Sequence, residues 1–142
     1  MKTPVKIALF VVFFIAVCGI LAALYLYNLK PKNLQNVKPH FVVTATDFQK
    51  AFEENEKASS EMYINKIIEV SGEIASVKPG EKKTLNVSLK TGSDFSAVIC
   101  TFPDVSDTTF FKTGNQITLR GVCSGFLMDV LLNNCAVIKN PK

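Results

Sequence analysis

The sequence predicts an all-β barrel domain with accessory helices, carried behind a helix that crosses a membrane. Three observations predict it: an apolar stretch over residues 5–27, a stretch of helical period over residues 46–63, and five later segments in which apolar and polar residues alternate. A chain of 142 residues leaves room for one small domain besides the apolar helix. We therefore expect an N-terminal membrane anchor (1–28), a linker (29–43) and a barrel domain (44–142).

Residues 5–27 are apolar apart from Lys6, and as a helix they would span roughly 34 Å, enough to cross the apolar core of a bilayer. Tyr25 and Tyr27 stand where an aromatic belt is expected. A cleaved signal peptide is the less favoured alternative, because small residues lie inside the apolar stretch rather than after it. Cys18 follows Val17 and precedes more apolar sequence, so we interpret it as a membrane-buried thiol rather than a lipidation site.

Lysines flank the anchor on both sides, so the positive-inside rule leaves its orientation open. The short N-terminus favours a single-pass signal anchor with the barrel on the extracytoplasmic (periplasmic) side. Of the 16 basic residues, five lie within residues 1–39, where there is no acid. The remaining 11 face 12 acidic residues, which leaves a net charge of about −1 and no basic surplus for a nucleic-acid face.

The stretch after the linker predicts one amphipathic helix. Thr46 and Gln49 fit a capping box, with Thr46 as the N-cap. Apolar and small residues then recur at three- and four-residue steps as far as Tyr63, and the charged residues fall largely on the other faces. The linker itself is polar and holds two prolines, so we expect a semi-extended tether.

Alternation of period two predicts five strands, at residues 67–74, 85–89, 97–102, 117–121 and 130–138, with turns at 78–83 and 91–94. A short helix is expected over residues 104–112. This order predicts a five-stranded OB-fold, a Greek-key barrel preceded by one α-helix and the N-terminal transmembrane helix. Gly72 and Gly121 would allow the bending that a small barrel needs.

Three segments carry a family resemblance: "KIIEVSGEI" (66–74), "KTGNQITLRG" (112–121) and "GVCSGFLMDVLLNNC" (121–135), together with Tyr63 before the first strand. From about Phe48 to Ile138 the chain resembles the bacterial tRNA_anti-like family of OB-fold domains. The resemblance implies an OB-fold, often carried behind a membrane anchor or a lipoprotein signal. The family name records a fold similarity to anticodon-binding domains, not an activity.

OB-folds that bind single strands use aromatic residues on the second and third strands. On residues 84–90 the expected outward side chains are polar or charged: Thr84, Asn86, Ser88 and Lys90. On residues 97–102 one alternation offers no outward aromatic and the other offers only Phe102. The candidate ligand-binding residues are therefore four cations: Lys78, Lys82, Lys83 and Arg120.

Eleven residues lie between Cys123 and Cys135, and this spacing is typical neither of a redox-active cysteine pair nor of a zinc knuckle. Buried thiols are the first interpretation. A Cys123–Cys135 disulfide across neighbouring strands is the second, and it would need an oxidising compartment. A metal site with Cys100 is a distant third, and the one histidine, His40, lies in the linker. Asp129 is expected to bond backbone amides and fix a turn.

No nucleophile–base pair or phosphate-binding loop is evident in the sequence, so we expect no enzyme, no cofactor and no metal. The function expected is a non-enzymatic binding or interaction module, anchored through residues 5–27, whose partner is a protein, peptide or glycan of the cell envelope. Binding of single-stranded nucleic acid is the alternative. The ligand's identity and the oligomeric state stay open.

Overall fold

The computed structural model describes residues 3–29 and 33–139, which belong to two compact units, Met1–Pro31 and Lys32–Lys142. The first unit contains α1 (Thr3–Tyr27), on which no side chain is buried. Its mean hydropathy reaches 3.1. Among the described residues it is the one helix long and apolar enough to cross a membrane, at about 38 Å for 25 residues.

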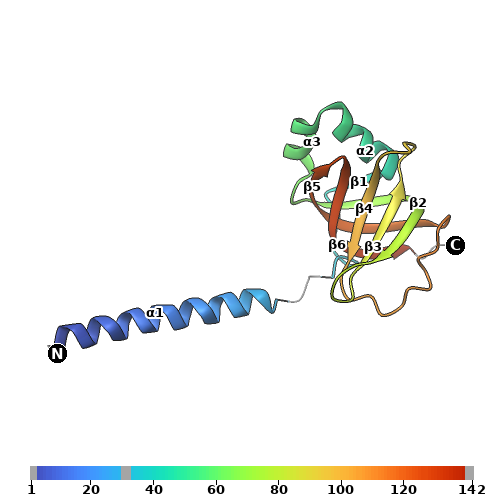
Figure 1. The fold of residues 1–142 in the computed structure, drawn as a ribbon. Coiled ribbons are helices and arrows are strands. Elements are labelled where there is room, and N and C mark those ends of the chain that lie inside the picture. Colours follow the sequence, from blue (N-terminus) through green and yellow to red (C-terminus); the bar gives the residue numbers. More distant parts are fainter. Residues whose placement is uncertain (1–2, 30–32, 140–142) are drawn as a thin grey trace. The chain divides into compact units, whose positions relative to one another are not determined.

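The second unit is a closed β-barrel with two helices (Figure 1). Its elements are β1 (Phe41–Thr44), α2 (Ala45–Glu54), α3 (Glu56–Tyr63), β2 (Ile67–Pro79), β3 (Leu85–Lys90), β4 (Ala97–Phe102), β5 (Gln116–Leu127) and β6 (Asp129–Lys139). The strand order is β1-β2-β3-β4-β6-β5, and a β2–β5 pairing closes the barrel. Apart from the parallel β4–β6 pair, the barrel strands pair antiparallel. The predicted OB-fold is confirmed, with its five strands at the expected places.

The long strand β2 joins the two halves of the barrel. Residues 67–73 pair with β5, and the part from Ile74 to Pro79 pairs with β3, with a register shift between Ile74 and Ser76. Gly72 lies at the change of partner, where an added Cβ would come within 2.9 Å of the Ala45 Cβ. Glycine is therefore used here for the close approach of the first residue of α2 to the barrel wall.

β1 is a strand that the sequence analysis placed inside the linker. It pairs parallel with β2, with Phe41 opposite Ile68, and upstream of it Leu34 is 2% exposed. The part of the expected tether from Leu34 to Val43 thus belongs to the barrel unit and packs on it through Leu34 and β1. The apolar side chains of Leu34, Phe41 and Val43 explain this packing, because they would otherwise remain in water.

The predicted helix is two helices, with the break at Asn55. The Asn55 side chain caps α3 by accepting a hydrogen bond from the Ala58 N–H at 3.0 Å. The N-cap of α2 is Thr44, whose Oγ1 accepts from the Asp47 N–H at 3.1 Å, so the predicted capping box at Thr46 was wrong by two residues. β1 ends at Thr44, which places its extended backbone directly before the first helical turn.

The helix predicted over residues 104–112 was also wrong, because this segment forms irregular turns. It is held by one aromatic residue: Phe111 is buried, and its ring centroid lies 4.9 Å from that of Phe102. The backbone N–H of Val105 also donates to the Lys83 carbonyl. The segment is therefore a loop that packs on the barrel through Phe111.

The interior is filled largely by alternate residues of the barrel strands; on β6, where the pairing is irregular, Val130, Leu132 and Cys135 are buried. On β4 the inward set is Val98, Cys100 and Phe102, which decides the alternation that the sequence left open. Its outward set is therefore Ala97, Ile99 and Thr101. β3 points Leu85, Val87 and Leu89 inward, as expected.

Replacing Gly121 by alanine is expected to lower the free energy of unfolding by about 1–3 kcal/mol, because the core has no room for the added methyl group. The new Cβ would lie 2.6 Å from the Cys135 Sγ and 3.3 Å from the Asn133 carbonyl oxygen. Urea unfolding of the full chain in detergent measures the effect. In a double-mutant cycle, Cys135→Ala should recover part of the loss. An unchanged unfolding midpoint for Gly121→Ala would contradict this packing.

Candidate functional site

The four cations proposed from the sequence lie on two different parts of the barrel. Lys78 lies near the exposed end of β2, and Lys82 and Lys83 follow it in the turn to β3. Arg120 is on β5, opposite Glu69. Glu69 and Lys78 are nine positions apart on β2, up to about 30 Å along an extended strand. Arg120 thus lies beside the first half of β2, whereas the lysines lie at the end of β2 and in the turn that follows it.

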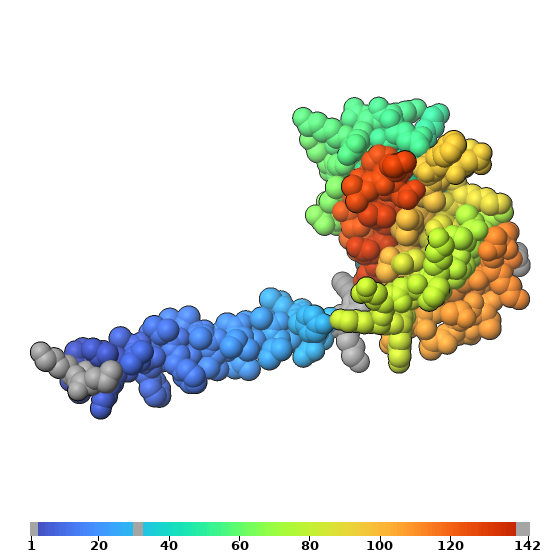
Figure 2. All heavy atoms as spheres, in the orientation of Figure 1, coloured from blue at the N-terminus to red at the C-terminus, as the bar shows by residue number. Residues whose placement is uncertain are grey.

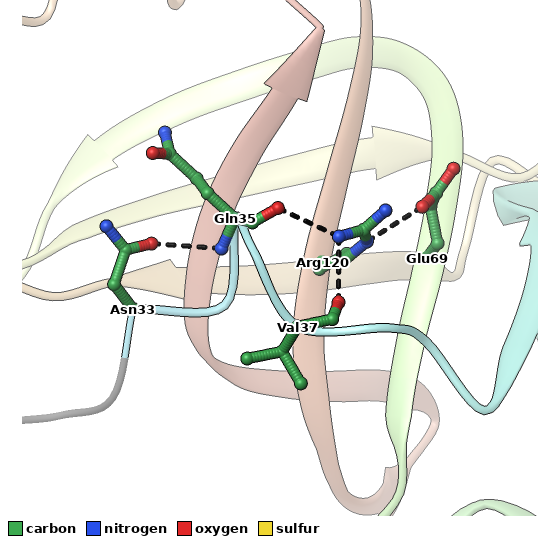
Figure 3. A network of polar contacts seen from close by, with 5 residues as sticks. All are labelled: Asn33, Gln35, Val37, Glu69 and Arg120. Carbon is green, nitrogen blue, oxygen red and sulfur yellow. Dashed lines mark hydrogen bonds and ion pairs between the residues drawn. The ribbon is translucent and has the colours of Figure 1, made fainter.

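Arg120 is engaged within the protein (Figure 3). Its Nε lies 2.8 Å from the Glu69 Oε2, and its Nη1 donates to the carbonyls of Gln35 at 2.9 Å and Val37 at 2.8 Å. The side chains of Arg120 and Glu69 are only 17% and 19% exposed. Arg120 thus holds the segment before β1 against the barrel, which is a structural role.

The outer face of β3 and β4 corresponds to the usual nucleic-acid face of an OB-fold. Its outward side chains are Asn86, Ser88, Lys90, Ala97, Ile99 and Thr101. Thr101 donates to the Asn86 Oδ1 at 2.9 Å, and Lys90 is paired with Glu73. This set contains no aromatic ring on which a base could stack.

The three barrel cysteines are buried free thiols. The disulfide considered for Cys123 and Cys135 is not formed in the structure, and the Cys135 Sγ instead donates to the Leu132 carbonyl at 3.5 Å. Burial raises the pKa of Cys100 well above its usual value and that of Cys123 to about 11. No group of three or more His, Cys, Asp or Glu that could hold a metal occurs among residues 3–29 and 33–139.

The raised thiol pKa of Cys123 predicts a loss of stability in alkali. In the unfolded chain this thiol ionises near 9.0, but in the folded protein only near 11. Between these values the folded state holds the proton and the unfolded state releases it, so the free energy of unfolding falls as pH rises. We expect the urea midpoint of Cys123→Ala to fall less than that of the parent chain between about pH 9 and pH 11. Equal falls would contradict the assignment.

A hollow lies at the end of the barrel beside α2 and α3, and we call it the tip groove. Its volume is about 680 Å³, and it is lined by Glu53, Glu56, Ser93, Phe95, Ser96, Phe126, Leu127 and Met128. Phe95 lies in the β3–β4 turn. Leu127 ends β5, and Met128 makes the turn to β6. These two turns come together at this end (Figures 1 and 2). Phe95 is 87% exposed, Leu127 79% and Met128 71%.

Hydrogen bonds around α2 fix the walls of the tip groove. The Glu53 Oε1 accepts from the Gln49 Nε2 and from the Ser96 Oγ, both at 3.1 Å. The same Gln49 Nε2 donates to the Met128 carbonyl at 2.7 Å. These bonds connect α2 to both turns. Gln49 was expected at the helix cap, whereas the structure places it, 2% exposed, between helix and hairpin.

Aromatic packing and one carboxylate complete the support of the groove. Phe126 stacks on Phe52 with ring centroids 5.3 Å apart. The Asp129 Oδ1 accepts from the Ala97 N–H at 2.8 Å. Asp129 therefore bonds a backbone amide, as expected, although that amide belongs to β4 rather than to its own turn.

The tip groove is not predicted by the sequence alone. Its only local signal is the presence of large apolar residues at turn positions, Phe95 after "TGSD" and Leu127-Met128 before Asp129. Turn tips are usually polar, so apolar residues in two turns could have marked a binding surface. Nothing in the sequence, however, indicates that the two turns meet.

Fold and surface together define an OB-fold domain with an exposed apolar groove, preceded by an apolar N-terminal helix. The tRNA_anti-like family model matches residues 1–137, and the chain belongs to this family. No curated protein matches it. Among solved structures, the chain is similar to that of an inferred nucleic acid-binding lipoprotein from Klebsiella pneumoniae subsp. pneumoniae MGH 78578. The TM-score is 0.57 at 18% identity, over 68% of this chain and 91% of that one, which is a likeness of fold.

Proposed function

We propose that this protein is a membrane-anchored binding module without catalytic activity, whose OB barrel stands on the extracytoplasmic side and binds a protein, peptide or glycan of the cell envelope. The observation that carries the proposal is the tip groove, where three large apolar side chains are exposed around one hollow. Exposed apolar surface is costly in water unless a partner covers it. The apolar helix α1 supports the anchoring.

Contacts of the reactive side chains support a non-enzymatic role. The thiols of Cys100 and Cys123 have raised pKa values, and a protonated thiol is a weak nucleophile. The Nδ1 of His40 accepts from the Ile67 N–H at 3.1 Å, at the start of the β1–β2 pairing. These side chains are thus occupied in holding the fold.

Single-stranded nucleic acid is the second candidate, because the similar lipoprotein from Klebsiella pneumoniae is described as nucleic acid-binding. The lysines at the β2–β3 turn would supply phosphate contacts. The outer face of β3 and β4 does not favour nucleic-acid binding, because its outward side chains include no aromatic ring on which a base could stack. Binding of this kind would weaken steeply with added salt.

A photo-crosslinking amino acid at Phe95 tests the proposal in cells that produce the full chain. Ile99, on the outer face of β4, is the matched control position. We expect protease-sensitive or glycan-containing adducts from position 95 and few from position 99. Nuclease-sensitive adducts, or adducts mainly from position 99, would contradict the proposal. An alkaline-phosphatase reporter after Lys142 tests the side of the membrane, and an inactive reporter would place the barrel in the cytoplasm.

A further inference from the structure

We propose that the tip groove binds a peptide segment of a partner protein in which an apolar side chain is flanked by lysine or arginine. The inference rests on the proposed function and names the chemistry of its ligand.

The apolar part of the ligand follows from the lining of the groove. Phe95 comes from one turn, and Leu127 and Met128 come from another some thirty residues later in the chain. Single exposed apolar residues are ordinary, but three of them around one hollow with Phe126 beside them offer a continuous apolar surface. A volume of about 680 Å³ suits one or two large apolar side chains of a ligand.

The basic part of the ligand follows from the charge at the rim. Glu53 and Glu56 line the groove, and Asp94 lines an adjoining hollow of about 470 Å³ that shares Phe95. In the described part of the chain, no lysine or arginine forms an ion pair with any of these three carboxylates. Lys90, which also lines the adjoining hollow, is paired with Glu73.

Glu53 is placed to receive a cation. Both of its hydrogen bonds within the described structure are accepted by Oε1, so Oε2 stays available to a ligand. Carboxylates at the rim attract ammonium and guanidinium groups, and they repel phosphates and anionic headgroups. A basic and apolar peptide therefore fits the groove better than a nucleic acid or an anionic lipid surface.

The walls are also held in place before any ligand binds. Gln49 ties α2 to the Met128 carbonyl, and Ser96 ties the β3–β4 turn to Glu53. Met128 itself has a φ of 65°, in the left-handed region that non-glycine residues seldom adopt. A groove with fixed walls loses little conformational entropy on binding, which favours affinity for a short segment.

The test uses the full chain in nanodiscs of phosphatidylcholine, a lipid without net charge, with empty nanodiscs as the blank. Fluorescence anisotropy follows four labelled probes: Lys-Lys-Leu-Phe-Lys-Lys, Glu-Glu-Leu-Phe-Glu-Glu, Lys-Lys-Ser-Ser-Lys-Lys and a short oligodeoxythymidine. We expect the first to bind at least ten-fold more tightly than each of the others. Equal or tighter binding of the acidic peptide or the oligonucleotide would overturn the inference.

Substitutions then assign the binding to the groove. Leu127→Ser should weaken the first peptide by about ten-fold, because the variant loses apolar contact. The double variant Glu53→Gln with Glu56→Gln should weaken it by about ten-fold in low salt, since each exposed ion pair is worth a few-fold. Glu54→Gln is the matched control: Glu54 is the neighbour of Glu53, but it pairs with Lys50 outside the groove. Loss of binding in the control alone, or in no variant, would overturn the assignment.

The alternative occupant of the tip groove is the lipid bilayer. A fluorophore on Phe95→Cys, in a Cys18→Ser background, should not be quenched by brominated lipid in the nanodisc. Quenching without peptide would assign the groove to lipid and overturn the inference. If no probe binds but photo-crosslinking at position 95 still yields a protein or glycan adduct, the peptide chemistry is wrong and the proposed binding function stands. If position 95 yields no such adduct, the proposed function fails as well.

Discussion

Replacing Arg120 by methionine should lower the free energy of unfolding by about 3 kcal/mol. The substitution leaves the Glu69 carboxylate, at 19% side-chain exposure, without its partner, and it removes the donor to two backbone carbonyls. Breaking a fully buried pair costs about 3–5 kcal/mol, and the remaining solvent contact here places the effect at the lower end. Arg120→Lys should recover little, because an ammonium group lacks the planar fork of donors that these acceptors meet.

Two measurements check this prediction on the full chain in detergent. Urea unfolding gives the loss of stability, and Lys90→Met is the control, since its ion pair with Glu73 is more exposed and should change stability by about 1 kcal/mol at most. Hydrogen exchange should be faster at the His40 N–H, which donates to the Ile67 carbonyl. Unchanged exchange there, together with unchanged stability, would show that Arg120 does not hold this segment.

Phe52→Ala should have the largest effect of the substitutions considered, a loss of about 3–5 kcal/mol. Phe52 is 1% exposed, and its ring packs against those of Phe48, Tyr63 and Phe126, with centroids 5.3–5.9 Å apart. Removing it opens a cavity between α2, α3 and the β5–β6 hairpin. Because Phe126 lines the tip groove, the same substitution should also weaken binding there.

Two control variants test whether the loss of stability comes from the lost volume of the Phe52 ring and from its buried position. Phe52→Leu keeps most of the volume and should cost less than about 1.5 kcal/mol. Phe110→Ala removes a ring that is 42% exposed and should change stability only slightly. If Phe52→Ala were no more destabilising than Phe110→Ala, the aromatic cluster would not be what joins the helices to the barrel.

Much of the barrel could be predicted because the signals are local. Leu85, Val87 and Leu89 alternate with polar residues, and the structure buries all three. Where local signals competed, the prediction failed. Thr44 and Thr46 are both plausible N-caps, and only the pairing of Phe41–Thr44 with β2 decides between them. A four-residue strand next to prolines resembles a linker until its partner strand is known.

The sites depended more on tertiary structure than the fold did. The sequence predicts that Arg120 is a cation available to a ligand. Its partners in the structure lie about 50 to 85 residues away along the chain: Glu69, Val37 and Gln35. Cys135 was considered a partner of Cys123, but the β-bulges of the β5–β6 pair alter the simple register, and the Cys135 Sγ donates to the Leu132 carbonyl. A simple alternation cannot anticipate such shifts, because a bulge changes which residues stand opposite each other.

By itself the sequence determined the apolar helix, the five strands and the inward faces of β2, β3 and β5, because hydrophobic periodicity depends on neighbouring residues. Only the tertiary structure decided which side chains meet. It closed the barrel through the β2–β5 pairing, engaged Arg120 and brought Phe95 to Leu127 and Met128 around one groove. These are contacts between segments far apart in the chain, and their geometry is set by the closure of the whole sheet rather than by any local preference.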